Sequence, residues 1–292
     1  MIWILVRRIE INEELQLIED ELKSRKLPYK ILELAKITFL LKNGGTEFYY
    51  DSIKIDLPSV CLIRIGTIGA SHWYLLNLIR QIETQGVKCI NPSETIDDLG
   101  GKHKISLSLA KYGVPIPDFF IYTSVRDIPI ILDQFHFPII LKTFYGSFGE
   151  GVYICRTPDE FIALAKFLFN VANSAYLVQE YIGYCVGEDV RVLVINNNIV
   201  GAMRRISPSS FKANLTDSDA YAIPQNVTED IVNVVSSITD HIDLQFVGID
   251  LLQDRDGYKV CEINNNTGFQ YFNKFCNRSL QQEIVSYIET LI

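Results

Sequence analysis

The chain has 292 residues, a length that suggests about two domains, and 48% of them are hydrophobic, enough to form real cores. The formal net charge of −8 disfavours a general nucleic-acid-binding role, which usually shows a basic face. No apolar stretch approaches the roughly 20 residues that cross a bilayer, and the short N-terminal apolar run lacks a signal-peptide cleavage site.

Short apolar strands alternate with amphipathic helices over the first 95 residues. Strands are predicted in IWILV, YKILEL, SVCLIRIG and VKCINP. One helix is predicted where Leu15, Ile18 and Leu22 recur at helical spacing, and another in WYLLNLIRQIETQG, which ends at Gly86. This alternation indicates a small α/β domain.

The rest of the chain mixes strands, hairpins and helices. KHKISLSLAKYG predicts a helix, and VPIPDFFIY, FPIILKTF and AYLVQEYI predict strands, with a helix in PDEFIALAKFLFNVA. EDVRVLVINNNIVGAMRRIS predicts a hairpin that turns at Asn196–Asn198. VTEDIVNVVSSITDHI predicts a helix capped by Thr228, and LQQEIVSYIETLI predicts the final helix.

Two acids and an asparagine occupy matching positions of a predicted hairpin near the C-terminus, where DRDG joins two apolar runs. A hairpin centred on Asp256 places Asp250 opposite Glu262, and Asn264 on the same face. Two opposed carboxylates repel one another unless a cation lies between them. Hard oxygen ligands suit Mg²⁺ or Mn²⁺, so we predict a metal site here. The alternative is that each acid is solvated or paired with a Lys or Arg.

A lysine late in a predicted strand precedes a glycine-rich loop. Lys142 is followed by GSFGEG, in which Gly146, Gly149 and Gly151 let backbone N–H groups approach phosphate oxygens. The spacing matches neither a Walker A motif nor GxGxxG, and the alternative is a hairpin tip. Further on, the strand LVQEYI becomes polar at Glu180, where strand-end groups can read an adenine edge. We place Asp189 in a turn just beyond, within reach of ribose hydroxyls.

The cysteines and one arginine carry weaker signals. The six cysteines include no C-x-x-C pair, and their scatter indicates a reducing compartment and a cytoplasmic protein. We expect Cys261 to face away from the metal, as strand alternation requires, and to pack in the core. Arg64 ends a predicted strand near the presumed cleft, where it is either a ligand for a substrate carboxylate or an ordinary surface arginine.

Together these segments resemble the ATP-grasp superfamily, and within it the RimK-type ligases (ribosomal-protein glutamate ligases and the amino-group-carrier ligases of lysine biosynthesis). The matching stretches run in the family's order and spacing over essentially the whole chain: RIGT, KHKISLSLAKYGVPIPDF, PIILKTFYGSFGEGV, LVQEYI, EDVRVLVINNNIVGAMRR, FKAN, VGIDLL and GYKVCEINNNTGF. The resemblance implies an α/β (α+β) ATP-grasp fold, with an N-terminal domain at 1–95, a central lid at 96–181 and a C-terminal part at 182–292. ATP would lie between two antiparallel sheets.

The resemblance also implies roles for individual residues. The expected nucleotide ligands are Lys102 and Lys142 on the phosphates, Gly146, Ser147 and Gly149 in the loop over them, Glu180, Tyr181 and Ile182 at adenine, Asp189 at ribose, and Asn214 near the phosphates. The expected metal ligands are Asp250, Glu262 and Asn264. The expected catalytic residues are Arg205, near the acylating carboxylate, and Lys142.

The implied chemistry is ATP-dependent ligation. A carboxylate attacks the γ-phosphate to form an acyl phosphate, and an amine then displaces phosphate to give an amide. ATP and Mg²⁺ or Mn²⁺, as two ions, are the expected cofactors. The expected partners are amino acids, peptides, proteins or a carrier protein as substrates, without nucleic acid or membrane. The resemblance also implies a homo-dimer or homo-tetramer, since family members are often dimers or tetramers. Positioning and charge neutralisation supply most of the rate in such a site.

Three departures from the family pattern leave the acceptor open. Gly101 stands where the family usually has an Asp, NLTDSDAYAIP lacks a Gly-Gly turn, and NNNTGFQYF lacks a proline. Two other hypotheses therefore stand beside an active carboxylate–amine ligase. One is a nucleotide-binding regulator that has lost catalysis, and the other is an ATP-grasp enzyme that makes esters, thioesters or peptide cross-links. The intact metal ligands and both lysines favour an active ligase.

Overall fold

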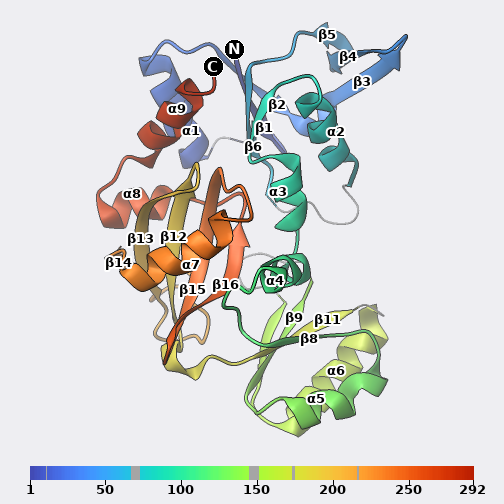
Figure 1. Ribbon diagram of the computed structural model, residues 1–292, viewed down its shortest axis with the longest axis vertical. Helices are drawn as coiled ribbons and strands as arrows, with labels where there is room; N and C mark the ends of the chain where they lie inside the picture. The colour runs from blue at the N-terminus through green and yellow to red at the C-terminus, as the bar shows by residue number, and fades with distance from the viewer. Residues whose placement is uncertain (11, 67–72, 145–150, 173–174, 216) are drawn as a thin grey trace.

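The computed structural model describes residues 1–292 except 11, 67–72, 145–150, 173–174 and 216. Three parts, each built on its own sheet, follow one another along the long axis of the molecule (Figure 1). The N-terminal sheet lies at one end, the C-terminal sheet in the middle and the central sheet at the other end (Figure 1). Within the described part of the chain, no helix is both long and apolar enough to cross a membrane.

A four-stranded parallel sheet forms the N-terminal part, as predicted. Its order is β2-β1-β6-β7. Its strands are β1 (Ile2–Val6), β2 (Tyr29–Glu33), β6 (Val60–Arg64) and β7 (Lys88–Ile90), and its helices are α1 (Glu13–Ser24), α2 (Trp73–Glu83) and α3 (Ser93–Asp98). Every residue of β1 is buried, as expected for an inner strand covered on both faces.

A small antiparallel sheet projects from this part and was not predicted. It consists of β3 (Ile37–Lys42), β4 (Gly45–Tyr50) and β5 (Ile53–Ile55) in that order. Two two-residue turns join the strands, and all four turn residues have positive φ, as tight hairpins require. Five of the six residues of β3 are exposed, so no buried face gives the strand an alternating pattern.

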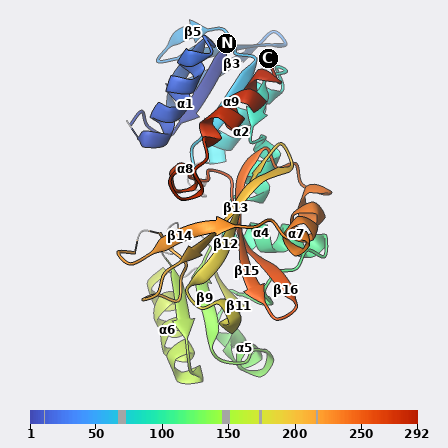
Figure 2. The same cartoon turned by 90° about the vertical axis from the view of Figure 1, so that its left-hand side faces the viewer.

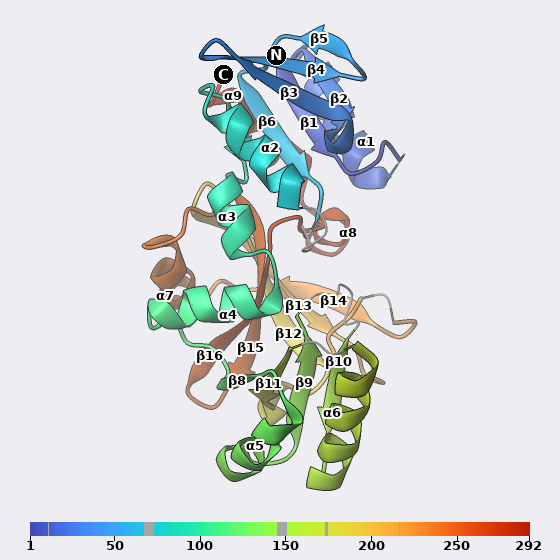
Figure 3. The ribbon, with the colours of Figure 1, turned by 90° about the vertical axis from the view of Figure 1, so that its right-hand side faces the viewer.

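The central part is an antiparallel sheet covered on one face by two helices (Figure 3). Its strands are β8 (Phe119–Tyr122), β9 (Ile139–Thr143), β10 (Val152–Cys155) and β11 (Tyr176–Glu180). In the sheet they lie in the order β10-β9-β11-β8. Its helices are α5 (Ile128–Gln134) and α6 (Pro158–Ala172). Phe161 and Ile131 from the helices pack on Tyr122 and Val178 of the sheet. The predicted strands and α6 are present, whereas β10 and α5 were missed.

The C-terminal sheet has five antiparallel strands in the order β14-β13-β12-β15-β16. They are β12 (Glu188–Ile195), β13 (Asn198–Ile206), β14 (Tyr221–Gln225), β15 (Phe246–Asp254) and β16 (Gly257–Asn264). Helices α4 (Lys102–Lys111) and α7 (Glu229–Thr239) cover one face, where Leu109 and Ile238 pack on Val192 and Ile249. Thr228 is the N-cap residue of α7, as predicted, but its side chain makes no capping hydrogen bond.

Two helices cross the predicted boundaries between the parts. Helix α4 falls in the predicted central range but packs on the C-terminal sheet. After α8 (Gln270–Cys276), helix α9 (Leu280–Glu289) returns to the N-terminal part and lies against α1 (Figures 1 and 2). Arg25 Nη1 donates to Glu289 Oε2 at 2.6 Å across that contact. Packing therefore joins the two ends of the chain.

Arg64 ties the N-terminal sheet to the loop that follows β16. Its Nη2 donates to Glu14 Oε2 at 2.9 Å and its Nη1 to the carbonyl oxygen of Thr267 at 3.0 Å. The other oxygen of Glu14 accepts from the backbone N–H groups of Phe269 and Gln270, where α8 begins. The Arg64 side chain is only 10% exposed, so the expectation of a surface arginine is wrong. Its guanidinium is engaged by the protein itself.

We expect Arg64→Ala to lower the free energy of unfolding by about 3–5 kcal/mol, because it leaves the mostly buried Glu14 carboxylate without its cation. Arg278→Ala is the matched control. It removes an arginine from a more exposed ion pair with Glu283, where the expected loss is below about 1 kcal/mol. Urea unfolding measures both values. Equal losses would show that the Arg64–Glu14 pair does not hold the two parts together.

Candidate active site

The C-terminal sheet carries a polar cluster on the face that α4 and α7 leave uncovered. Asp189 and Arg191 lie two residues apart in β12, so their side chains share this face. Arg205 of β13 is the register partner of Asp189, and Asp250 of β15 is the partner of Arg191. Further along the same face, Leu193 packs in the core shared with the N-terminal part. One face thus serves as core at one end and as the polar cluster at the other.

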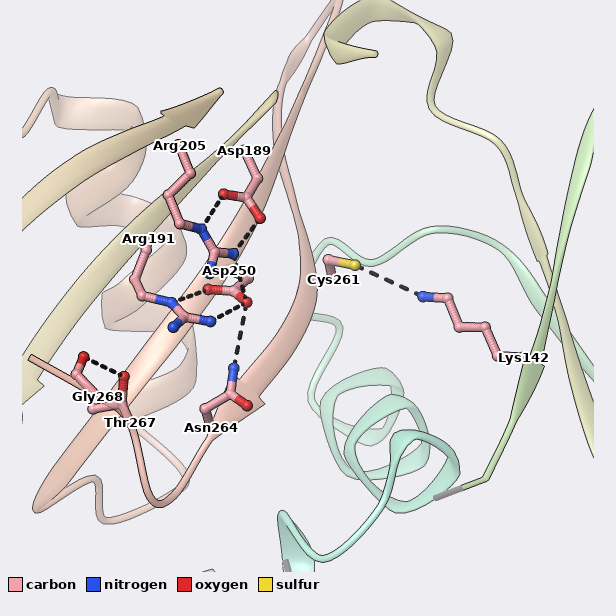
Figure 4. A network of polar contacts seen from close by, with 9 residues as sticks. All are labelled: Lys142, Asp189, Arg191, Arg205, Asp250, Cys261, Asn264, Thr267 and Gly268. Carbon is pink, nitrogen blue, oxygen red and sulfur yellow. Dashed lines mark hydrogen bonds and ion pairs between the residues drawn. The ribbon is translucent and has the colours of Figure 1, made fainter. Parts of the chain in front are cut away.

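The carboxylate of Asp250 lies between two guanidinium groups (Figure 4). Arg191 donates to it through two bonds, Nε to Oδ1 and Nη2 to Oδ2, both at 2.7 Å. Arg205 Nη2 lies 2.9 Å from the same Oδ2. Arg205 also donates hydrogen bonds from Nε and Nη2 to the two carboxylate oxygens of Asp189. Arg205 therefore links the two buried carboxylates.

The charges in this network shift one another's pKa values. Burial acts to raise the pKa of Asp250, but Arg191 and Arg205 outweigh burial and lower that pKa. Burial raises the pKa of Asp189 to about 6, against the opposing effect of Arg205. Burial acts to lower the pKa of Arg205, yet the two carboxylates raise it, so this guanidinium stays charged.

The predicted pairing of the metal motif is present. Asp250 is opposite Glu262, Gly248 is opposite Asn264, and Asn264 Nδ2 lies 3.3 Å from Asp250 Oδ2. The hairpin is not centred on Asp256, however. Its turn centres between residues 255 and 256, and a β-bulge between the turn and Asp250 restores the predicted pairs.

The bulge turns Cys261 toward the cleft. Its Sγ lies 3.7 Å from the Nζ of Lys142, which reaches across from β9 of the central sheet (Figure 4). The prediction that Cys261 faces away from the site is therefore wrong. Strict alternation holds only in a regular strand, and a bulge adds one residue without a partner.

Glu262 lies close to both predicted phosphate-binding lysines. Burial and Asp250 raise the pKa of Glu262, whereas Lys102 and Lys142 act to lower it. Burial lowers the pKa of Lys102, the first residue of α4. Lys142 is 6% exposed. Within the described residues, no hydrogen bond or ion pair occupies the Glu262 carboxylate, which leaves it open to a cation.

The cluster fits a divalent cation with few protein ligands. In the ranges that the structure describes, no group of three or more His, Cys, Asp or Glu side chains is placed to hold a metal ion. The candidate ligands are instead two facing carboxylates, Asp250 and Glu262, and the amide of Asn264. Mg²⁺ commonly binds through one or two carboxylates and completes its shell with water and substrate phosphates.

The predicted adenine-binding segment lies where β11 ends. Glu180 Oε1 accepts from the backbone N–H of Asp118 and forms an ion pair with Lys259 of β16. Its carboxylate therefore links the central sheet to the C-terminal hairpin. Next to Tyr181 is a cavity of about 520 Å³, whose other lining residues include Pro138, Ile154, Arg156, Val186 and Phe211.

The structure brings half of the predicted site residues together in one cluster. Those gathered in the cluster are Lys102, Lys142, Asp189, Arg205, Asp250, Glu262 and Asn264. Asp189 lies inside strand β12, so its predicted place in a turn is wrong. Asn214 lies in the segment between β13 and β14, and Gly146, Ser147 and Gly149 fall outside the described residues. Arg191 was missed, although its position two residues after Asp189 in a predicted strand was a usable signal.

Residues 100–288 match the RimK-like ATP-grasp domain. The chain belongs to this family. It is 25% identical to human (Homo sapiens) β-citrylglutamate synthase B over 100% of this chain and 78% of that protein. It is 30% identical to the glutamate–LysW ligase ArgX of Sulfurisphaera tokodaii over 91% of this chain and 94% of that one. The ATP-grasp ligase PsnB with its minimal precursor has the same fold, at a TM-score of 0.77 and 15% identity, covering 99% of both chains.

Family membership and the fold confirm three sequence expectations. The protein is an ATP-grasp enzyme of the RimK type. It has the mixed α/β fold with antiparallel sheets. Its activity is ATP-dependent carboxylate–amine ligation, which releases ADP. The family uses ATP with a divalent metal, and the cluster around Asp250 and Glu262 suits both.

We expect Glu262→Gln to raise the thermal stability of the metal-free protein at neutral pH while reducing ATP turnover by orders of magnitude. The folded state raises the Glu262 pKa above 4.5, so ionisation of Glu262 opposes folding. The stability gain should be full above the folded-state pKa and should vanish below the unfolded value.

Thermal melts of parent and variant across pH 4–8 measure this gain, and steady-state ADP release measures turnover. Glu10→Gln removes a negative charge at an exposed position and is the control. A Glu262→Gln protein that melts lower than the parent but keeps its turnover would make Glu262 a structural residue.

Proposed function

We propose that this chain joins a small carboxylic acid to the amino group of an amino acid of the glutamate class. The observation that carries the proposal is that charged side chains from the central sheet, from α4 and from the C-terminal sheet converge. Lys142 reaches from the central sheet, Lys102 from α4 and Arg191 and Arg205 from the C-terminal sheet, all toward the acids Asp250 and Glu262. Such a cluster suits phosphates, a metal and a carboxylate substrate.

In the proposed nucleotide complex, Lys102 and Lys142 contact the phosphates and the cavity beside Tyr181 holds adenine. The Glu180 carboxylate already has two protein partners, so the backbone of Glu180 to Ile182 is what reads the adenine edge. We keep Asp189 as the proposed ribose ligand, because each of its carboxylate oxygens accepts one hydrogen bond from Arg205 and has room to accept another. Asn214 and the loop with Gly146, Ser147 and Gly149 complete the proposed phosphate site.

The reaction needs charge neutralisation at the transferred phosphoryl group. Two Mg²⁺ ions, held by Asp250, Glu262 and Asn264 together with phosphate oxygens, would supply part of it. Arg205 and Lys142 supply the rest and orient the acid for attack on the γ-phosphate. The amine then attacks the acyl carbon, phosphate leaves, and the amide forms.

The names of the relatives support the substrate class. β-Citrylglutamate synthase B and N-acetylaspartylglutamate synthase A, which match essentially this whole chain, are both named for products in which glutamate is joined to another acid. ArgX is named for joining glutamate to LysW. We therefore place glutamate on the amine side and a small di- or tricarboxylic acid on the donor side.

An ADP-release screen tests this assignment. Citrate, N-acetylaspartate and other small acids are combined with glutamate, other amino acids, acidic peptides and a LysW-type carrier, and mass spectrometry identifies the product. Turnover with a free acid and glutamate supports the proposal. Turnover only with peptides or carriers would contradict the proposal and show that the enzyme is a peptide or carrier ligase. Nucleotide binding without any turnover points to the regulatory protein.

Lys142→Ala should weaken ATP binding by about 1.5–3 kcal/mol, because it removes a charge-assisted phosphate contact. The fold should persist, since within the described residues this ammonium group makes a single hydrogen bond, the long contact with Cys261. Calorimetric titration measures the affinity. Lys166→Ala, at an exposed position of α6 in the same part of the molecule, is the control. Unchanged ATP affinity in Lys142→Ala would remove Lys142 from the site.

A further inference from the structure

We infer that Arg191 is a positioning residue that holds Asp250 until a divalent cation and the nucleotide phosphates bind together. The cation alone does not displace it. This inference rests on the proposed function and adds to it a coupling between metal binding and nucleotide binding. Metal and nucleotide occupy the cleft jointly, and the step that couples them is the release of Asp250 by Arg191.

The first observation is that Asp250 has no open side. Arg191 donates one hydrogen bond to each oxygen of the carboxylate, and Arg205 and the Nδ2 of Asn264 both approach Oδ2. Asp250 as a whole is 5% exposed. A cation that binds Asp250 must therefore displace a donor that is already charged and mostly buried. Asn264 must also turn, since it presents its N–H₂ group to Asp250, whereas a cation needs its oxygen.

The second observation is the net charge of the cluster. Among the described residues it has four cations, Lys102, Lys142, Arg191 and Arg205, against three carboxylates, Asp189, Asp250 and Glu262. A bare dication would add to a cluster that is already net positive. The polyphosphate of a nucleotide reverses the sign, so the metal becomes favourable only in its presence.

The third observation distinguishes Arg191 from Arg205. Arg205 is anchored by Asp189 through two further bonds, so it stays in place when Asp250 is taken. Both hydrogen bonds that Arg191 makes in the described structure go to Asp250. The Arg191 side chain is 17% exposed and runs beside Gly248. A Cβ atom added at Gly248 would lie 3.6 Å from Arg191 Cδ and only 2.4 Å from Thr267 Oγ1, so a larger residue would not fit there. Once Asp250 binds the metal, Arg191 is available for an anionic group of the substrate.

Mn²⁺ binding, followed by electron paramagnetic resonance, tests the inference without relying on activity. The parent protein should bind Mn²⁺ poorly alone and tightly with a non-hydrolysable ATP analogue. Arg191→Met frees the Oδ1 atom of Asp250, so it should bind Mn²⁺ alone at least about tenfold more tightly than the parent, as expected for a typical coupling between sites. Arg191→Lys keeps the charge but cannot grip both oxygens, and its affinity should lie between these two.

Arg204→Met is the matched control. Arg204 precedes Arg205 in β13, points to the opposite face and contacts Glu188, Gln225 and Gln253. It loses the same charge without touching Asp250, so its affinity for Mn²⁺ alone should equal that of the parent. An equal gain in Arg204→Met and Arg191→Met would reduce the effect to net charge and overturn the inference.

Two further results separate this inference from the proposed function. If the parent binds Mn²⁺ alone as tightly as with the nucleotide analogue, the coupling is refuted whatever the enzyme ligates, and this measurement needs no variant to fold. If the coupling is present but the substrate screen shows no ligation to glutamate, the proposed substrate class fails and the role of Arg191 stands. Circular dichroism confirms that each variant is folded.

Discussion

Two guanidinium groups share the buried carboxylate of Asp250, and the other polar residues of the site are arranged around that contact. A buried carboxylate is costly without a cation, so some positive group must accompany Asp250 in every state of the protein. In this structure the group is Arg191 together with Arg205. Arg205 also fixes Asp189, while Glu262, directly across the ladder, is left without an ion pair in the described residues. A ligase that must bind metal and polyphosphate together can use an exchange in which Asp250 leaves Arg191 and binds the metal.

The scaffold makes the contact possible by dividing one face of the C-terminal sheet. Near Leu193 and Phe246 the face is apolar and packs against α8, α9 and the N-terminal part. Two residues before Leu193 in β12, at Arg191, the face becomes polar. Two contacts join the central sheet to β16 of the C-terminal sheet: the Glu180–Lys259 ion pair and the approach of Lys142 to Cys261. The apolar end therefore supplies stability, and the polar end is left for chemistry.

Patterns with a strong local cause could be predicted from the sequence. The turn composition of DRDG and strand alternation predicted the hairpin and the Asp250–Glu262 pair, although the pair forms because a β-bulge offsets the wrongly predicted turn centre. The same rule failed for Cys261, because the bulge that turns it inward has no residue signature in VCEIN. Arg64 was misjudged because its partner, Glu14, comes from a distant helix. Strands β3 to β5 were not predicted, because a largely exposed sheet shows no alternation of apolar and polar residues in the sequence.

The most direct test of this account is anomalous diffraction from crystals grown with Mn²⁺ and a non-hydrolysable ATP analogue. The account predicts a manganese peak in contact with the carboxylates of Asp250 and Glu262, with Arg191 withdrawn from at least one oxygen of Asp250 and Arg205 still bound to Asp189. A peak that touches only phosphate oxygens, with both Arg191 bonds to Asp250 intact, would contradict it.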